Sequence, residues 1–205
     1  MNKILTTAIA ACGFIAAASA PLTAEAATSV FSGKDATVYA EGYDGNLYLF
    51  VNAFENASKS KSVKATSSGA YAYGYDYDGT YYYYFYGDTT TIQFKATGKI
   101  PNKVIASGSI PVTGSLCEVN FPYYCYPYSD TVTFNVNADA LGDQAYHNWG
   151  TTHYENGPFK QNNHFDYSSA PAAFNDSFIT SSRGTVNPTW GSVGDSKFHD
   201  VDITK

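Results

Sequence analysis

The stretch that decides the fold class is residues 71–86, which read YAYGYDYDGTYYYYFY. Tyrosines occupy every second position from Tyr71 to Tyr77, and a second aromatic run follows the Asp78-Gly79 step. Successive side chains of a strand point to opposite faces, and Asp-Gly is a favoured hairpin turn. The stretch therefore predicts two antiparallel strands with tyrosines gathered on one face.

The expected register follows from a two-residue loop at Asp78-Gly79. It predicts three cross-strand pairs on one face, which are Tyr75–Tyr82, Tyr73–Tyr84 and Tyr71–Tyr86. On the other face small residues oppose large rings, so an aromatic ring is expected over the backbone of Gly74. This second face is predicted to point to the core.

The row of tyrosines has two interpretations. An exposed row of phenol rings suits stacking against sugar rings or capture of a protein partner. Alternatively, the rings only stabilise the sheet, because cross-strand aromatic pairs contribute up to about 1 kcal/mol each. The six tyrosines are candidate ligand-binding residues under the first interpretation: Tyr71, Tyr73, Tyr75, Tyr82, Tyr84 and Tyr86.

The rest of the chain is also typical of β-structure, because Tyr, Phe, Thr and Val are abundant and no helical periodicity is sustained. Alternating apolar positions such as Val132, Phe134 and Val136 predict strands with one buried face. Residues 139–196 are rich in Gly, Asn, Ser and Pro, which favours loops. The predicted fold is an all-β, antiparallel two-sheet β-sandwich with long loops in the C-terminal half.

The N-terminal residues predict export. Lys3 precedes an apolar run that ends in small residues, as in a secretory signal peptide. Cleavage after Ala26 leaves a mature chain of residues 27–205, which is expected to be a single domain in a secreted or periplasmic location. No integral membrane segment is predicted in the mature chain, since no apolar run there reaches the roughly 18 residues of a spanning helix.

The two cysteines of the mature chain predict a disulfide. Cys117 and Cys125 are an even pair in an oxidising compartment, and no further ligands stand at the spacing of a metal site. We expect neither a metal nor another cofactor.

The charge balance disfavours nucleic acid as a partner, because the formal net charge is −6. Lys59, Lys61 and Lys64 form the only basic cluster along the chain, and their Ser and Ala neighbours favour a solvated linker.

A second candidate ligand-binding patch lies at His147, Trp149 and His153, which would share one face of a strand. The alternative is that these side chains merely lie on a solvated strand. Trp190, beside Pro188 and Gly191, is predicted to anchor the core or a lid.

No catalytic residue is assigned, because neither a nucleophile elbow nor a metalloprotease motif occurs. The leading expectation is a secreted noncatalytic binding module whose partner is a carbohydrate or a surface protein. The alternatives are a secreted hydrolase with its site near His147 and His153, or a purely structural surface protein.

Overall fold

The computed structural model describes residues 27–60, 64–98, 102–120, 123–142, 145–156 and 159–204. The predicted signal peptide, residues 1–26, lies outside the described residues. The described part of the chain is built from strands, whose bounds are β1 (Ala27–Asp44), β2 (Leu47–Ser60), β3 (Lys64–Tyr77), β4 (Tyr81–Thr89), β5 (Ile92–Thr97), β6 (Lys103–Glu118), β7 (Cys125–Ala140), β8 (Tyr146–Asn156), β9 (Phe159–Phe174), β10 (Phe178–Ser181), β11 (Gly184–Val186) and β12 (Trp190–Thr204).

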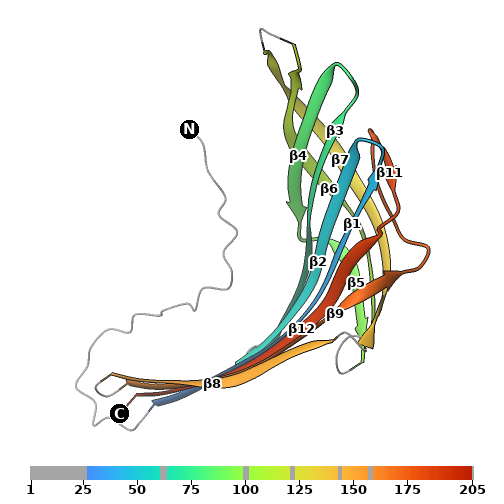
Figure 1. Ribbon diagram of the computed structural model, residues 1–205. Coiled ribbons are helices and arrows are strands. Elements are labelled where there is room, and N and C mark those ends of the chain that lie inside the picture. The colour runs from blue at the N-terminus through green and yellow to red at the C-terminus, as the bar shows by residue number, and fades with distance from the viewer. Residues whose placement is uncertain are drawn as a thin grey trace.

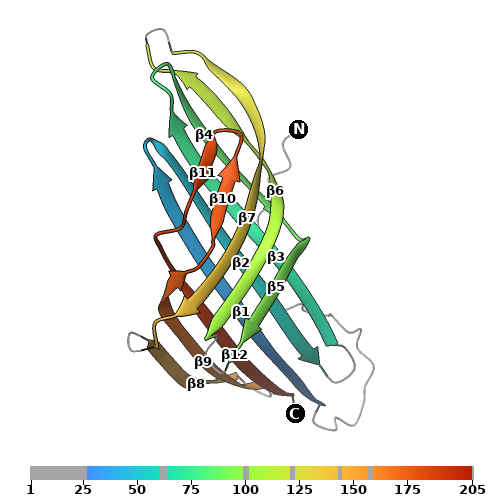
Figure 2. The same ribbon diagram turned by 90° about the vertical axis from the view of Figure 1, so that its right-hand side faces the viewer.

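All strands belong to one antiparallel sheet with the order β11-β10-β7-β6-β4-β3-β2-β1-β12-β9-β8, while β5 pairs with β6. The sheet closes on itself because β7 also pairs with β9, from Ala138 opposite Phe174 to Ala140 opposite Ala172. The strands β7, β6, β4, β3, β2, β1, β12 and β9 therefore form a ring, which is a barrel (Figures 1 and 2).

This single sheet takes the place of the predicted two-sheet sandwich, while the all-β antiparallel class is confirmed. Alternation along a strand is the same in both architectures, since each buries one face of every strand. The choice between them depends on which distant strands pair, and here β1 pairs with β12 over fifteen residue positions from Ala27 to Glu41.

The C-terminal half contains long strands where loops were predicted. Residues 146–204 supply β8 to β12, and β9 alone runs from Phe159 to Phe174. The alternation signal is weak there because β8 is exposed on both sides, so neither face requires apolar residues. Figure 1 shows β8 and the adjoining ends of β9, β12 and β1 extending past the barrel as a curved arm.

The barrel interior is apolar. Its largest fully buried side chains are Phe85, Phe134, Leu49, Ile110 and Ile179. An eight-stranded ring is just wide enough for such side chains to fill. Val132, Phe134 and Val136 point inward as predicted.

The tyrosine hairpin has a different register from the predicted one. Tyr77 pairs with Tyr82, Tyr75 with Tyr84 and Tyr73 with Tyr86, so each predicted partner is displaced by two positions. The cause is the turn: the Asp78 carboxylate accepts hydrogen bonds from the backbone N–H groups of Thr80 and Tyr81, at 3.0 and 2.9 Å. A shift of two positions keeps every side chain on its predicted face. Gly74 now lies opposite Phe85, whose ring covers it.

Candidate functional site: an aromatic outer wall

Aromatic side chains cover the outer surface of five neighbouring strands, β12, β1, β2, β3 and β4. Their outward positions alternate with the buried core positions of the same strands. We call this surface the aromatic wall, and its members are Tyr39, Tyr43, Tyr48, Phe50, Tyr71, Tyr73, Tyr75, Tyr77, Tyr82, Tyr84, Tyr86 and Trp190.

The rings of the wall contact one another across the strands. Trp190 meets Tyr39 edge-on at 5.3 Å between ring centroids, and Tyr39 meets Phe50 at 4.6 Å. Tyr48 stacks on Tyr75 at 4.9 Å, which continues the network to β3. Ring pairs in these geometries add about 0.5–1.5 kcal/mol each beyond area burial, so the wall holds a defined shape.

Part of the wall is well exposed. Tyr86 is 51% exposed, Tyr82 45% and Trp190 61%, whereas Tyr73 and Tyr75 are half-buried between their neighbours. The opposite wall, on β6 and β7, carries outward hydroxyl side chains such as Ser109 and Thr133, whose oxygens lie 3.1 Å apart. The outward positions of β6 and β7 are thus mainly polar, with Ile105 and Tyr126 as exposed exceptions.

The Glu41 carboxylate lies among the rings of the wall. Glu41 accepts hydrogen bonds from the hydroxyls of Tyr39 and Tyr48. Burial, and then the hydrogen bond to Glu41, raises the pKa of Tyr39 to about 12, and the same causes raise the pKa of Tyr48 further. Both phenols therefore stay neutral donors, which lets the wall hold a charged group among its rings.

The six predicted tyrosines lie together on the outer face, whereas the other members of the wall were not predicted from the sequence. Tyr39 and Tyr43 on β1 are four residues apart and Tyr48 and Phe50 on β2 are two apart, so each pair shares one face of its strand, which is the signal that could have found them. Trp190 was predicted to be a core or lid anchor, but it is an exposed member of the wall.

A polar cluster lies at one end of the barrel. Asp76, 7% exposed, receives the Arg183 guanidinium, whose Nε and Nη2 lie 2.8 and 2.7 Å from Oδ2. The same guanidinium lies over the ring of Tyr83, 3.9 Å from the ring centroid. Arg183 stands in the turn between β10 and β11, so this cluster ties that hairpin to the tyrosine hairpin.

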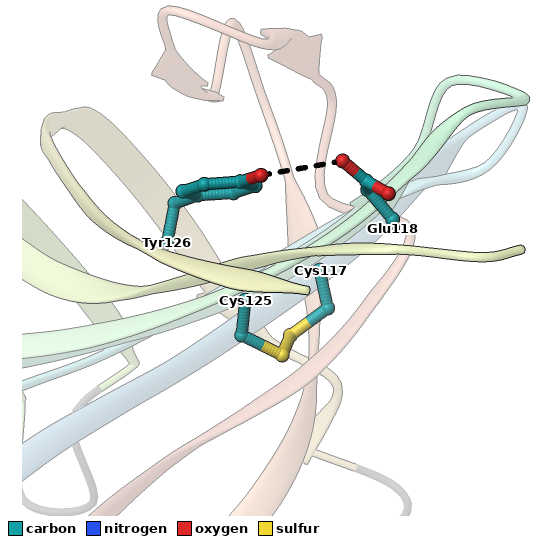
Figure 3. Close-up of a disulfide and its surroundings, with 4 residues drawn as sticks. All are labelled: Cys117, Glu118, Cys125 and Tyr126. Atoms are coloured by element: carbon teal, nitrogen blue, oxygen red, sulfur yellow. Dashed lines mark hydrogen bonds between the residues drawn. A yellow bond between two sulfur atoms is a disulfide. The ribbon is translucent and has the colours of Figure 1, made fainter. Parts of the chain in front are cut away.

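The predicted disulfide is confirmed. Cys117 at the end of β6 and Cys125 at the start of β7 lie directly opposite each other and are bonded. Figure 3 shows the bridge with the adjacent pair Tyr126 and Glu118, whose hydroxyl and carboxylate oxygens lie 3.4 Å apart. The bridge closes the β6–β7 connection.

The second predicted patch lies on β8, away from the wall. His147 Nε2 is 2.7 Å from Asp166 Oδ1, and His153 Nδ1 is 2.6 Å from Asn162 Oδ1. Trp149 is 72% exposed on the same face of β8. The structure brings the three residues onto one side of an edge strand, and their role in ligand binding stays a prediction.

No group of three or more His, Cys, Asp and Glu side chains in the part of the chain that the structure describes could hold a metal ion. The described residues also include no helix of the length and apolar character needed to span a bilayer.

No family model matches this chain, and no curated protein matches it. Among solved structures, the crystal structure of neisserial surface protein A has a TM-score of 0.29 and 10% sequence identity, and the match covers 87% of this chain and 99% of that chain. The β domain of the Bordetella autotransporter BrkA has a TM-score of 0.25 and 7% identity, over 86% of this chain and 99% of that chain.

Both neighbours are outer-membrane β-barrel proteins, and this finding contradicts several predictions. It contradicts the predicted secreted carbohydrate-binding module and the predicted absence of an integral membrane segment. The single closed sheet contradicts the predicted β-sandwich. A simply secreted or periplasmic location is likewise not supported.

Proposed function

We propose that this chain is a β-barrel of the cell envelope whose aromatic wall contacts the lipid–water interface of a membrane. The observation that carries the proposal is the continuous network of tyrosine and tryptophan rings over five neighbouring strands. These two side chains combine an apolar ring with a polar hydroxyl or N–H, and they are enriched where lipid headgroups meet the acyl chains.

The dimensions of the wall support this contact. Neighbouring strands lie about 4.8 Å apart, so five strands present a surface roughly 20 Å wide. Exposed aromatic patches of this extent are uncommon on proteins without a partner surface. The outward Ser and Thr side chains of β6 and β7 suit water, so the aromatic half of the barrel is the half that favours lipid.

The polar groups of the wall are largely paired with one another. Glu41 is the carboxylate at its centre, and its acceptance of hydrogen bonds from Tyr39 and Tyr48 lowers the cost of bringing that charge near lipid. Tyr43 and Tyr75 also place their hydroxyls 3.4 Å apart. Hydroxyls paired in this way lose less hydration when the rings approach the interface.

Trp190 supplies a direct test. The chain has two tryptophans, so Trp149→Phe leaves Trp190 as the only one. We expect this variant to float with phosphatidylcholine vesicles and its tryptophan emission to shift to shorter wavelength. A quencher at headgroup depth should quench Trp190 more than a quencher at the bilayer centre.

A matched pair of variants localises the contact. Tyr84→Ser with Tyr86→Ser removes two exposed rings of the wall, whereas Tyr146→Ser with Tyr167→Ser removes two exposed rings of the arm. We expect vesicle partitioning to fall about tenfold in the wall variant and to stay near wild type in the arm variant. Equal losses in both variants, or no vesicle binding by the parent protein, would refute the proposal.

A further inference from the structure

Four lysines from four neighbouring strands share one face of the sheet. They are Lys197 on β12, Lys34 on β1, Lys59 on β2 and Lys64 on β3, and we call them the lysine strip. Lys34 pairs with Lys197 and with Ala57, and Ala57 lies two positions before Lys59, so the alternation of strands places all four on one side.

The charges of the strip oppose one another directly. Lys34 lies opposite Lys197, and Lys59 lies opposite Lys64. Like charges at directly opposed positions of a sheet are destabilising. The chain carries two such pairs side by side although its formal net charge is −6.

Little within the protein compensates these charges. Among the described residues, Lys34, Lys59 and Lys64 form no ion pair. Lys197 has one carboxylate neighbour, the buried Asp195, at 3.7 Å. The linker predicted for Lys59 and Lys64 is not formed, because both stand in paired strands, and Lys61 lies outside the described residues.

The strip borders an open depression of about 410 Å³, which is lined by these four lysines and by small residues such as Ser32 and Ala57. Four strands at about 4.8 Å spacing span roughly 14 Å. The lysine strip is therefore long enough to face a ligand with several charged groups.

We propose that the lysine strip binds a ligand carrying at least two phosphate groups, one for each pair of opposed lysines. Lysine ammonium groups bind phosphate as compact point charges. An anion between two opposed lysines attracts both ammonium groups and so offsets their mutual repulsion. The strip continues the inward side of β1, where Ala36 and Val38 are buried, whereas Tyr39 of the aromatic wall points to the other side. The site is therefore independent of the proposed membrane contact.

Calorimetric titration with tripolyphosphate at low ionic strength tests the proposal. We expect binding to weaken about tenfold or more in Lys34→Gln with Lys197→Gln, and likewise in Lys59→Gln with Lys64→Gln. The control is Lys95→Gln with Lys103→Gln, which removes the same charge from β5 and β6 and should bind as wild type does.

Vesicles containing phosphatidylglycerol distinguish a lipid headgroup from a free phosphate compound. Sedimentation with these vesicles in excess of that with pure phosphatidylcholine vesicles, which reports the aromatic wall alone, assigns the phosphate to lipid if the strip variants and added tripolyphosphate both abolish the excess. Tripolyphosphate binding without such sedimentation assigns a free ligand. Both results support the site, whereas equal losses in the control, or no binding of either probe, would overturn it.

Thermal unfolding without ligand measures the repulsion between the opposed lysines independently of binding. Lys34→Gln alone is expected to raise Tm at low salt, and the gain should shrink as salt screens the charges. A Tm that falls at every salt concentration would mean that the opposed lysines do not repel, which removes the basis of the proposal.

Discussion

Arg183 holds Asp76 through two guanidinium nitrogens, Nε at 2.8 Å and Nη2 at 2.7 Å from the same carboxylate oxygen. The two residues come from the β10–β11 turn and from β3, which are distant in sequence. Their pairing neutralises a carboxylate that is 7% exposed and ties the β10–β11 hairpin to β3.

Removal of Arg183 alone should lower the free energy of unfolding more than removal of both Arg183 and Asp76. Arg183→Met leaves Asp76 as an uncompensated charge, and we expect it to lower the free energy of unfolding by about 3–5 kcal/mol. The double variant with Asp76→Asn should recover a large part of that loss. Urea unfolding followed by tyrosine fluorescence measures both, and additive effects in the double variant would contradict a direct ion pair.

The stability of the barrel is expected to fall at acidic pH, because the Asp78 carboxylate then becomes protonated. Backbone N–H groups of Tyr81 and Thr80 donate to its carboxylate and hold its pKa below the ordinary value of 3.8. A depressed pKa in the folded state means that the stabilisation is present above pH 3.8 and is lost as the pH falls through the lower value. Thermal unfolding between pH 2 and pH 5 should show a smaller pH dependence in Asp78→Asn than in wild type.

The stability of the barrel is expected to fall at alkaline pH, because the Tyr39 phenol of the aromatic wall then ionises. The pKa of Tyr39 is raised to about 12, from an ordinary value of 10.0, by burial and by Glu41. Its contribution is complete below pH 10 and is lost as the pH rises through 12. Tyr39→Phe should remove one late-ionising phenol from an ultraviolet titration, and a variant with an unchanged curve would contradict this assignment.

The close approach of β4 and β6 makes Gly114 intolerant of a side chain. A Cβ there would lie 1.8 Å from the backbone oxygen of Tyr84, which cannot move without breaking the sheet. We expect Gly114→Ala to lower the free energy of unfolding by about 3 kcal/mol. Gly142→Ala is the control, because a Cβ at that position meets nothing within 4 Å. Equal stability of the two variants in urea would contradict the strand contact.

The disulfide is expected to make a limited contribution to the free energy of unfolding. Its loop is short, and the chain-entropy relation gives about 2.5 kcal/mol for a separation of this size. Cys117→Ser with Cys125→Ser should therefore lower the urea midpoint while the barrel still folds. Complete loss of the β-sheet circular dichroism in this variant would show that the bridge is needed for the fold itself.

Local rules of the sequence determined the strand character and the faces. The spacing of two in Tyr71–Tyr77 determines that these rings share a side, and Val132, Phe134 and Val136 show the same rule for the core. The disulfide also followed from the sequence, since Cys117 and Cys125 are the two cysteines of the predicted mature chain. Each of these features depends on residues close together in the chain.

Only the tertiary structure decided which strands became neighbours. Pairing of β1 with β12 and of β7 with β9 closed a barrel instead of two sheets, and it opposed Lys34 to Lys197. The same closure placed Trp190 beside Tyr39 and Arg183 beside Asp76. Alternation specifies the side to which a residue points but not the partner strand, because pairing between distant segments depends on the packing of the whole sheet.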